Sequence, residues 1–149
     1  MAAYWFAIAM LSAFDKEVDF LADTIKGALT TATYTPAQDT HDYFNDVTNE
    51  VTDTGYTAGG ATFSNKTNTS SANVVTFDDT GTLQWTSDGA GSITARILVT
   101  YDSTPGTSAT NPLLWWDDFG SDQVASNGGT FTYTPHASGL ATITVGDAP

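Results

Sequence analysis

The chain has 149 residues, which suits one domain with a buried core, and its 40% hydrophobic content excludes a disordered chain. Its net charge of −13, with only four basic residues, disfavours binding to nucleic acid and to anionic membrane surfaces. Because it contains no cysteine, disulfide bonds and thiolate metal sites are excluded. Charged residues make up only 14% and threonine is abundant, which together favour a mainly β fold.

The first segment, residues 1–13, is almost entirely apolar and predicts a helix over 3–13. It lacks the basic residues of a signal peptide and is too short to span a bilayer, so we expect it in the mature fold. A helix that is apolar on all sides must be buried on more than one of them. We therefore expect an interface helix or arm against a neighbouring subunit, with Tyr4, Trp5 and Phe6 as candidate anchors, or else a plug at one end of the fold.

Two elements are predicted next. Residues 24–33 read as a strand. The sequence Thr-Pro-Ala-Gln at 35–38 combines a capping box with a proline at the first helical position. This pattern predicts a short helix over 37–46.

From position 54 onward, turn signals recur about every ten residues, which is typical of a sandwich or barrel. The short segments between them predict strands at 62–64, 73–77, 83–86, 113–119, 130–134 and 140–145. We therefore expect an antiparallel β-sandwich, jelly-roll-like, with one or two short helices near the N-terminus. No linker or internal repeat divides the chain, so 1–149 is predicted to be a single domain.

The longest β-branched run lies at 91–102 and is the predicted central strand. Every second residue from Ile93 to Tyr101 is apolar, which predicts one continuous buried face along it. Arg96, the only arginine, lies within this strand, and its guanidinium predicts a carboxylate partner because an unpaired buried charge would be costly.

No catalytic or cofactor motif is present, so we do not expect an enzyme. Asp39, His41 and Asp42 lie close in sequence, but neighbours on a helix point apart, which favours a solvated face over a metal site. The acid pairs at 78–79 and 117–118 cannot act as glycosidase dyads on their own, because adjacent strand residues face opposite ways. We expect no cofactor, and a structural calcium ion at a loop is the alternative.

Trp115 and Trp116 are consecutive in a predicted strand, so their side chains are expected on opposite faces. If one fills the core, the other lies outside, as an interface anchor, a sugar-stacking platform or part of a covered edge. One of these two residues is therefore a further candidate for the interface.

Several segments carry a likeness to a known family: DTIKGAL at 23–29, YTPAQDTHDYFNDV at 34–47, NEVTDTGYTAGG at 49–60, ITAR at 93–96 with YD at 101–102, DFGSDQ at 118–123 and NGGTFT at 127–132. In order along most of the chain, they resemble small virion structural proteins of tailed bacteriophages. The apolar N-terminal segment departs most from that family. The resemblance implies a part of the phage particle that is present in many copies and is not catalytic.

The resemblance leads us to expect a capsid decoration (cement) protein that binds and stabilises the major capsid lattice. Its expected partners are the major capsid protein and copies of itself, as a homo-oligomer such as a trimer, with the virion as its location. A tail or neck component is the first alternative. A carbohydrate-binding adhesion module on the virion is the second.

Overall fold

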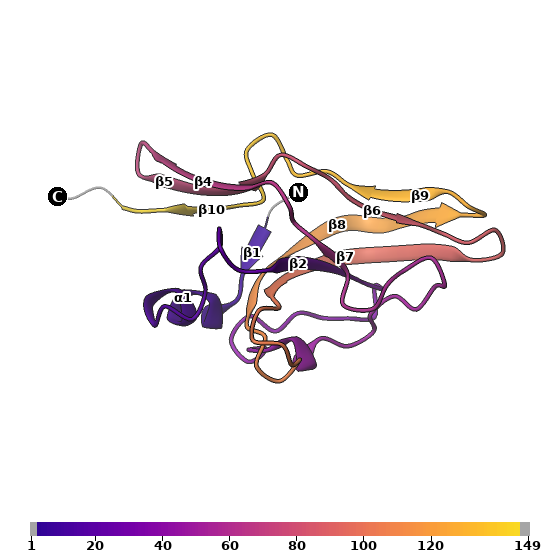
Figure 1. Cartoon of the computed structure of the whole chain (residues 1–149), viewed down its shortest axis with the longest axis horizontal. Coiled ribbons are helices and arrows are strands. Elements are labelled where there is room, and N and C mark those ends of the chain that lie inside the picture. Colours follow the sequence, from indigo (N-terminus) through magenta and orange to yellow (C-terminus); the bar gives the residue numbers. More distant parts are fainter. Residues whose placement is uncertain (1–2, 147–149) are drawn as a thin grey trace.

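The computed structural model describes residues 3–146 and shows two layers of antiparallel strands with an α-helix beside one end (Figure 1). The strands are β1 (Ala3–Trp5), β2 (Ile25–Thr30), β3 (Ala61–Thr62), β4 (Lys66–Ser71), β5 (Val74–Asp79), β6 (Leu83–Thr86), β7 (Ser92–Asp102), β8 (Leu113–Ser126), β9 (Thr130–Tyr133) and β10 (Ala141–Thr144). The helical elements are α1 (Ala7–Phe14) and the 3₁₀ helix η1 (Phe44–Asp46).

The main layer is a five-stranded sheet in the order β1-β8-β7-β2-β3. Its centre is β7, so the strand predicted at 91–102 is confirmed. The second layer consists of a three-stranded sheet, β10-β5-β4, and a two-stranded sheet, β6-β9 (Figure 1). The mainly β, antiparallel and sandwich-like fold expected from the sequence is therefore confirmed.

The larger hydrophobic core lies between the two layers, and a smaller one lies on the opposite face of the main sheet. The smaller core is covered by irregular segments that include η1, where the Phe44 ring stacks on Tyr101 with centroids 4.0 Å apart. The main sheet is thus covered on both faces, so nearly every residue of β2 and β7 is buried or half-buried.

β7 does not keep one apolar face along its length, so that part of the prediction was wrong. Its register with β8 shifts between Ala95 and Ile97, and the side chains beyond the shift point the other way. Ile93 and Ala95 join the larger core together with Leu98, whereas Ile97 belongs to the smaller one. Because of this register shift, a single strand contributes side chains to both hydrophobic cores.

The prediction of a helix over 3–13 was wrong for its first turn, because these residues form strand β1 instead. β1 pairs with β8 in the register Ala3↔Asp117 to Trp5↔Trp115, and α1 begins at Ala7. The edge of β8 offers backbone partners that a first helical turn would lack, so tertiary pairing overrides local helix propensity here.

The helix predicted over 37–46 was also wrong. The segment forms a turn followed by η1, in which the Asp46 carboxylate accepts the Tyr43 backbone N–H at 3.1 Å. Gln38 instead ties this segment to the N-terminus. Its side-chain amide donates to the Trp5 carbonyl at 2.7 Å, and its own carbonyl accepts the Ala7 N–H at 3.0 Å.

β4 was not predicted, because Lys66–Ser71 shows no apolar alternation and nearly all of it is exposed. It is the edge strand of its sheet, held by pairing with β5, and edge strands need no buried face. No helix within residues 3–146 is long and apolar enough to cross a membrane.

Candidate interaction surface

The five predicted interface residues gather around the junction of β1 and β8, but they differ in exposure. Tyr4 is 50% exposed and stacks on Trp116, with ring centroids 5.4 Å apart. Trp116 is only partly buried, and its other neighbour is Phe6, at 4.6 Å. Tyr4 and Trp116 therefore form a half-exposed aromatic stack on the outer side of β1 and β8.

Phe6 and Trp115 are wholly buried within the chain itself, at 0% and 1% exposure, so neither side chain lies on its surface. Phe6 caps α1 and donates its backbone N–H to the Leu114 carbonyl at 3.0 Å, which turns its ring into the smaller core. Trp115 faces the larger core because it is directed opposite to Trp116. Among the predicted anchors, these two hold the fold together.

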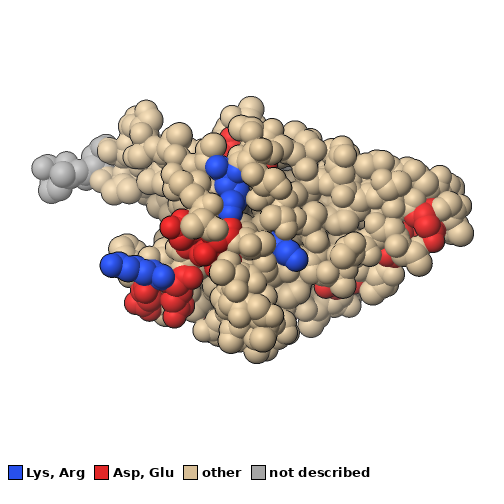
Figure 2. Space-filling view, viewed as in Figure 1, with Lys and Arg blue, Asp and Glu red and all other residues tan. Residues whose placement is uncertain are grey.

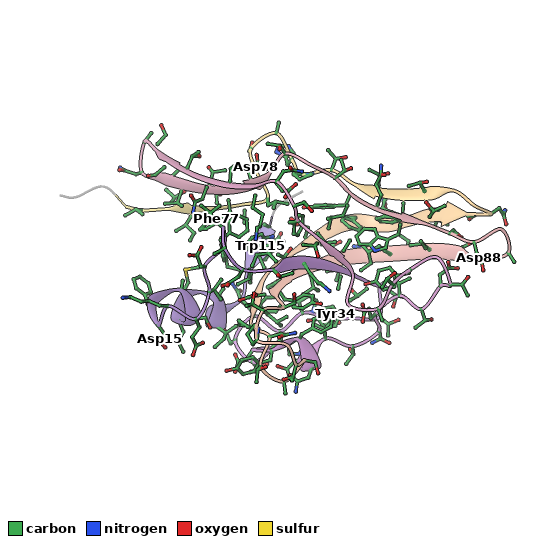
Figure 3. The ribbon with its side chains drawn as sticks, in the orientation of Figure 1. Asp15, Tyr34, Phe77, Asp78, Asp88 and Trp115 are labelled. Atoms are coloured by element: carbon green, nitrogen blue, oxygen red, sulfur yellow. The ribbon has the colours of Figure 1, made fainter. Side chains whose placement is uncertain are left out.

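Trp5 joins the two layers. Its indole N–H donates to the Thr142 carbonyl of β10 at 3.0 Å, and its ring meets Trp115 and Phe77 edge-on at 5.0 and 5.3 Å. Figure 3 shows Phe77 of the upper layer directed toward Trp115 of the main sheet. This aromatic group closes the core at the end of the molecule where α1 lies.

The structure adds two surface residues that sequence reasoning missed. Leu11 and Phe14 of α1 are 58% and 86% exposed, and their spacing of three places them on one side of the helix. α1 buries Ala9 and the small polar Ser12 instead. The sequence signal for these residues was the apolar circumference of the helix. A single chain covers only one side of such a helix, so an apolar side is left exposed.

A cleft of about 700 Å³ opens beside these residues, between α1 and the three-stranded sheet. It is visible as the hollow on the left of Figure 2. Aromatic and apolar side chains dominate its lining: Trp5, Met10, Phe14, Phe20, Phe77 and Trp115. We call Leu11, Phe14 and this cleft the α1 face.

Acidic side chains lie along one side of the α1 face, in the segment that follows the helix. Asp15, Glu17 and Asp19 follow the helix and are exposed, with Lys16 as a basic residue among them (Figure 2). An apolar centre with a charged rim is the usual make-up of a protein–protein contact. The sign of the rim favours a partner surface that carries basic residues.

The acid pairs that the sequence singled out have partners within the protein. Asp79 is buried and accepts the backbone N–H groups of Asn65 and Gly81, both at 2.7 Å. Asp117 is buried and accepts the Tyr133 hydroxyl at 2.8 Å, and burial raises the pKa of Asp117 to about 6. Asp79 thus closes the turn after β5, and Asp117 links β8 of the main sheet to β9 of the second layer.

Asp118 is the carboxylate partner predicted for Arg96, and the two form an ion pair. Their hydrogen bond lowers the pKa of Asp118. The pair lies at the register shift of β7 and is partly exposed, so it is not a deeply buried charge.

The His41 ring contacts the Tyr34 hydroxyl at 3.0 Å, which gives the histidine a partner within the fold. Within residues 3–146, no group of three or more His, Asp or Glu side chains is arranged to hold a metal ion. Comparisons of the chain with protein-family models, curated proteins and solved structures find no match.

Proposed function

We propose that this chain is a non-catalytic structural protein of a tailed-phage particle, and that it decorates the capsid by docking its α1 face on the major capsid lattice. Two observations support the proposal. One is the resemblance of the segments named above to small virion structural proteins. The other is that the fold leaves an apolar helix side and an apolar cleft open to solvent.

The exposed apolar side of α1 is the observation that carries the proposal. Phe14 is 86% exposed at the end of a helix, where a soluble monomer gains nothing from an aromatic ring. Burying Phe14 and Leu11 against a partner would contribute about 1.5–3 kcal/mol each. Repeated over many copies on a lattice, contacts of this strength hold neighbouring capsomers together.

The partners follow from the same surface. The acidic rim around α1 suits a basic patch on the major capsid protein, and the cleft is wide enough to receive apolar side chains from it. Copies of this chain would then lie side by side on the particle as a homo-oligomer, for instance a trimer. The proposed location is the outer surface of the virion.

The adhesion alternative draws less support from the geometry. It needs an open tryptophan platform, whereas Trp115 is buried and Trp116 is partly covered by Tyr4 and Phe6. A tail or neck component would use the same kind of apolar contact. The copy number per particle distinguishes it from a capsid protein. Hundreds of copies per particle support the shell, and a few copies or a few dozen support the neck or tail.

The test replaces Leu11 and Phe14 together by serine and measures how much protein purified particles bind. We expect the affinity to weaken by about 10²- to 10⁴-fold, since two apolar side chains are lost from the contact, with an unchanged melting temperature. Val124→Ser is the matched control, because Val124 is also exposed, at 59%, but lies on β8 away from α1. Full occupancy by the double variant would overturn the proposal.

A further inference from the structure

Asp102, the last residue of β7, carries a buried carboxyl with one unused oxygen. The residue is 0% exposed, and its Oδ1 accepts the Thr104 backbone N–H at 2.8 Å. Its Oδ2 is buried and receives no hydrogen bond from a donor group of the described residues. A buried carboxylate oxygen without a donor is costly unless a proton or a cation reaches it.

The group that faces Asp102 is another acid. Asp23, just before β2, is partly exposed. Burial is the main cause that raises the pKa of Asp102, and hydrogen bonds from Thr104 lower it. Asp23 raises it further, through its charge and through a side-chain hydrogen bond between the two carboxyl groups. The Asp23 carboxylate is itself held in place, because its Oδ2 accepts the Asp19 backbone N–H at 2.6 Å.

The two segments that carry these acids are fastened together. The Ser103 backbone N–H and hydroxyl both donate to the Thr24 carbonyl at 2.9 Å, and the Thr24 N–H donates to the Thr104 hydroxyl at 2.8 Å. The carboxylates of Asp23 and Asp102 are therefore unable to move far apart to relieve their repulsion.

No positive side chain of the described residues neutralises this pair. No Lys or Arg nitrogen within residues 3–146 lies within 4.0 Å of either carboxylate, the ion pair of that part of the chain being Arg96–Asp118. The nearest ammonium that the hydrogen bonds identify is Lys66, and it donates to the main-chain carbonyl of Asp23 rather than to its carboxylate.

We propose that Asp23 and Asp102 bind a hard divalent cation, Ca²⁺ or Mg²⁺, between the segment that precedes β2 and the end of β7. Carboxylate oxygens are the ligands such ions prefer. Because Asp102 is buried, water would complete the coordination from the side of the partly exposed Asp23. Asp102 would provide a buried carboxylate oxygen as one ligand. The cation would enter from solvent on the side of the partly exposed Asp23. The bound ion would lock the segment after α1 against the main sheet.

The test titrates CaCl₂ and MgCl₂ into the full chain after treatment with EDTA, with thermal melting and calorimetry as readouts. We expect a weak site, with the melting temperature rising by a few degrees by about 10 mM cation. NaCl at matched ionic strength is the control for screening in so acidic a chain. Asp23→Asn and Asp102→Asn should each abolish the excess over NaCl, while Asp122→Asn, an exposed acid elsewhere on β8, should keep it.

Two results would overturn the proposal. One is a response to divalent cations that is no larger than the response to NaCl, or that survives in both site variants. The other is a loss of stability above pH 4 that the metal-free chain shows and Asp23→Asn does not, with no response to cations, which would mean that the two acids share a proton instead. The comparison with the variant is needed because Asp117 lowers stability over the same pH range. Asp23→Asn carries the test alone if Asp102→Asn fails to fold, because Asp23 is only partly buried.

Discussion

Asp117 and Asp118 are neighbours in one strand, and their surroundings push their pKa values in opposite directions. Burial raises the pKa of Asp117 to about 6 from an ordinary value of 3.8, while Arg96 lowers that of Asp118. A carboxyl with a raised pKa in the folded state binds its proton more tightly there, so it makes the protein less stable as the pH rises from about 4 to above 6. Asp117 is therefore a weak point of the fold at neutral pH.

Asp117→Asn tests this. Relative to the variant, the wild-type chain should lose about 2–3 kcal/mol of unfolding free energy between pH 4 and pH 8, because the amide has no charge to bury. Urea unfolding at several pH values measures the difference. A difference that does not change with pH would contradict the assignment.

Tyr133→Phe provides the control at the same site. The Tyr133 hydroxyl donates to Asp117 and favours its charged form, so its removal should raise the pKa of Asp117 further. The pH range over which stability is lost should then move upward. This shift is not expected from a general loss of packing.

At the scale of elements, the short strands were predictable and the N-terminus was not. Strand positions such as Leu83–Thr86 followed from turn spacing and alternation, both local properties of the chain. β1 depends on an unpaired edge of β8 more than a hundred residues later, and β4 depends on β5 for its place. A partner distant in sequence leaves no local pattern, so β1 could not be predicted. β4 is joined to β5 through residues 72–73 and was missed because it shows no apolar alternation.

The structure changes what deletion of residues 1–13 should do. If residues 1–13 were only an interface arm, the deletion would leave a soluble domain that no longer joins particles. Because β1 and α1 supply Phe6, Trp5 and Ala9 to the cores, we now expect the truncated chain to lose more than about 5 kcal/mol, which is comparable to the stability of a whole domain. Circular dichroism should show no cooperative melting.

The double serine variant of Leu11 and Phe14 is the comparison for this deletion. Both side chains are exposed, so their replacement should leave the melting curve unchanged. A truncated chain that melts cooperatively within a few degrees of the full chain would show that residues 1–13 are an appendage rather than part of the core.

At the scale of the whole molecule, the sequence predicted the sandwich and part of the candidate surface. Tyr4 is on the surface as expected, whereas Phe6 and Trp115 are in the core. An aromatic residue suits a core and an interface equally well, and composition does not separate the two. Leu11 and Phe14 became candidates only once the structure placed Ala9 and Ser12 on the buried side of α1.

The net charge of −13 makes a prediction about the whole chain. So many like charges repel one another in the compact state, and salt screens that repulsion. The melting temperature at pH 7.5 should therefore rise by several degrees between about 20 mM and 500 mM NaCl, with a gain of roughly 1–2 kcal/mol. The same titration near pH 4, where the sequence pI of about 4.1 leaves little net charge, should show almost no rise. A salt response of equal size at both pH values would mean that the salt acts through apolar burial rather than through screening, and the acidic surface would then carry no cost for the fold.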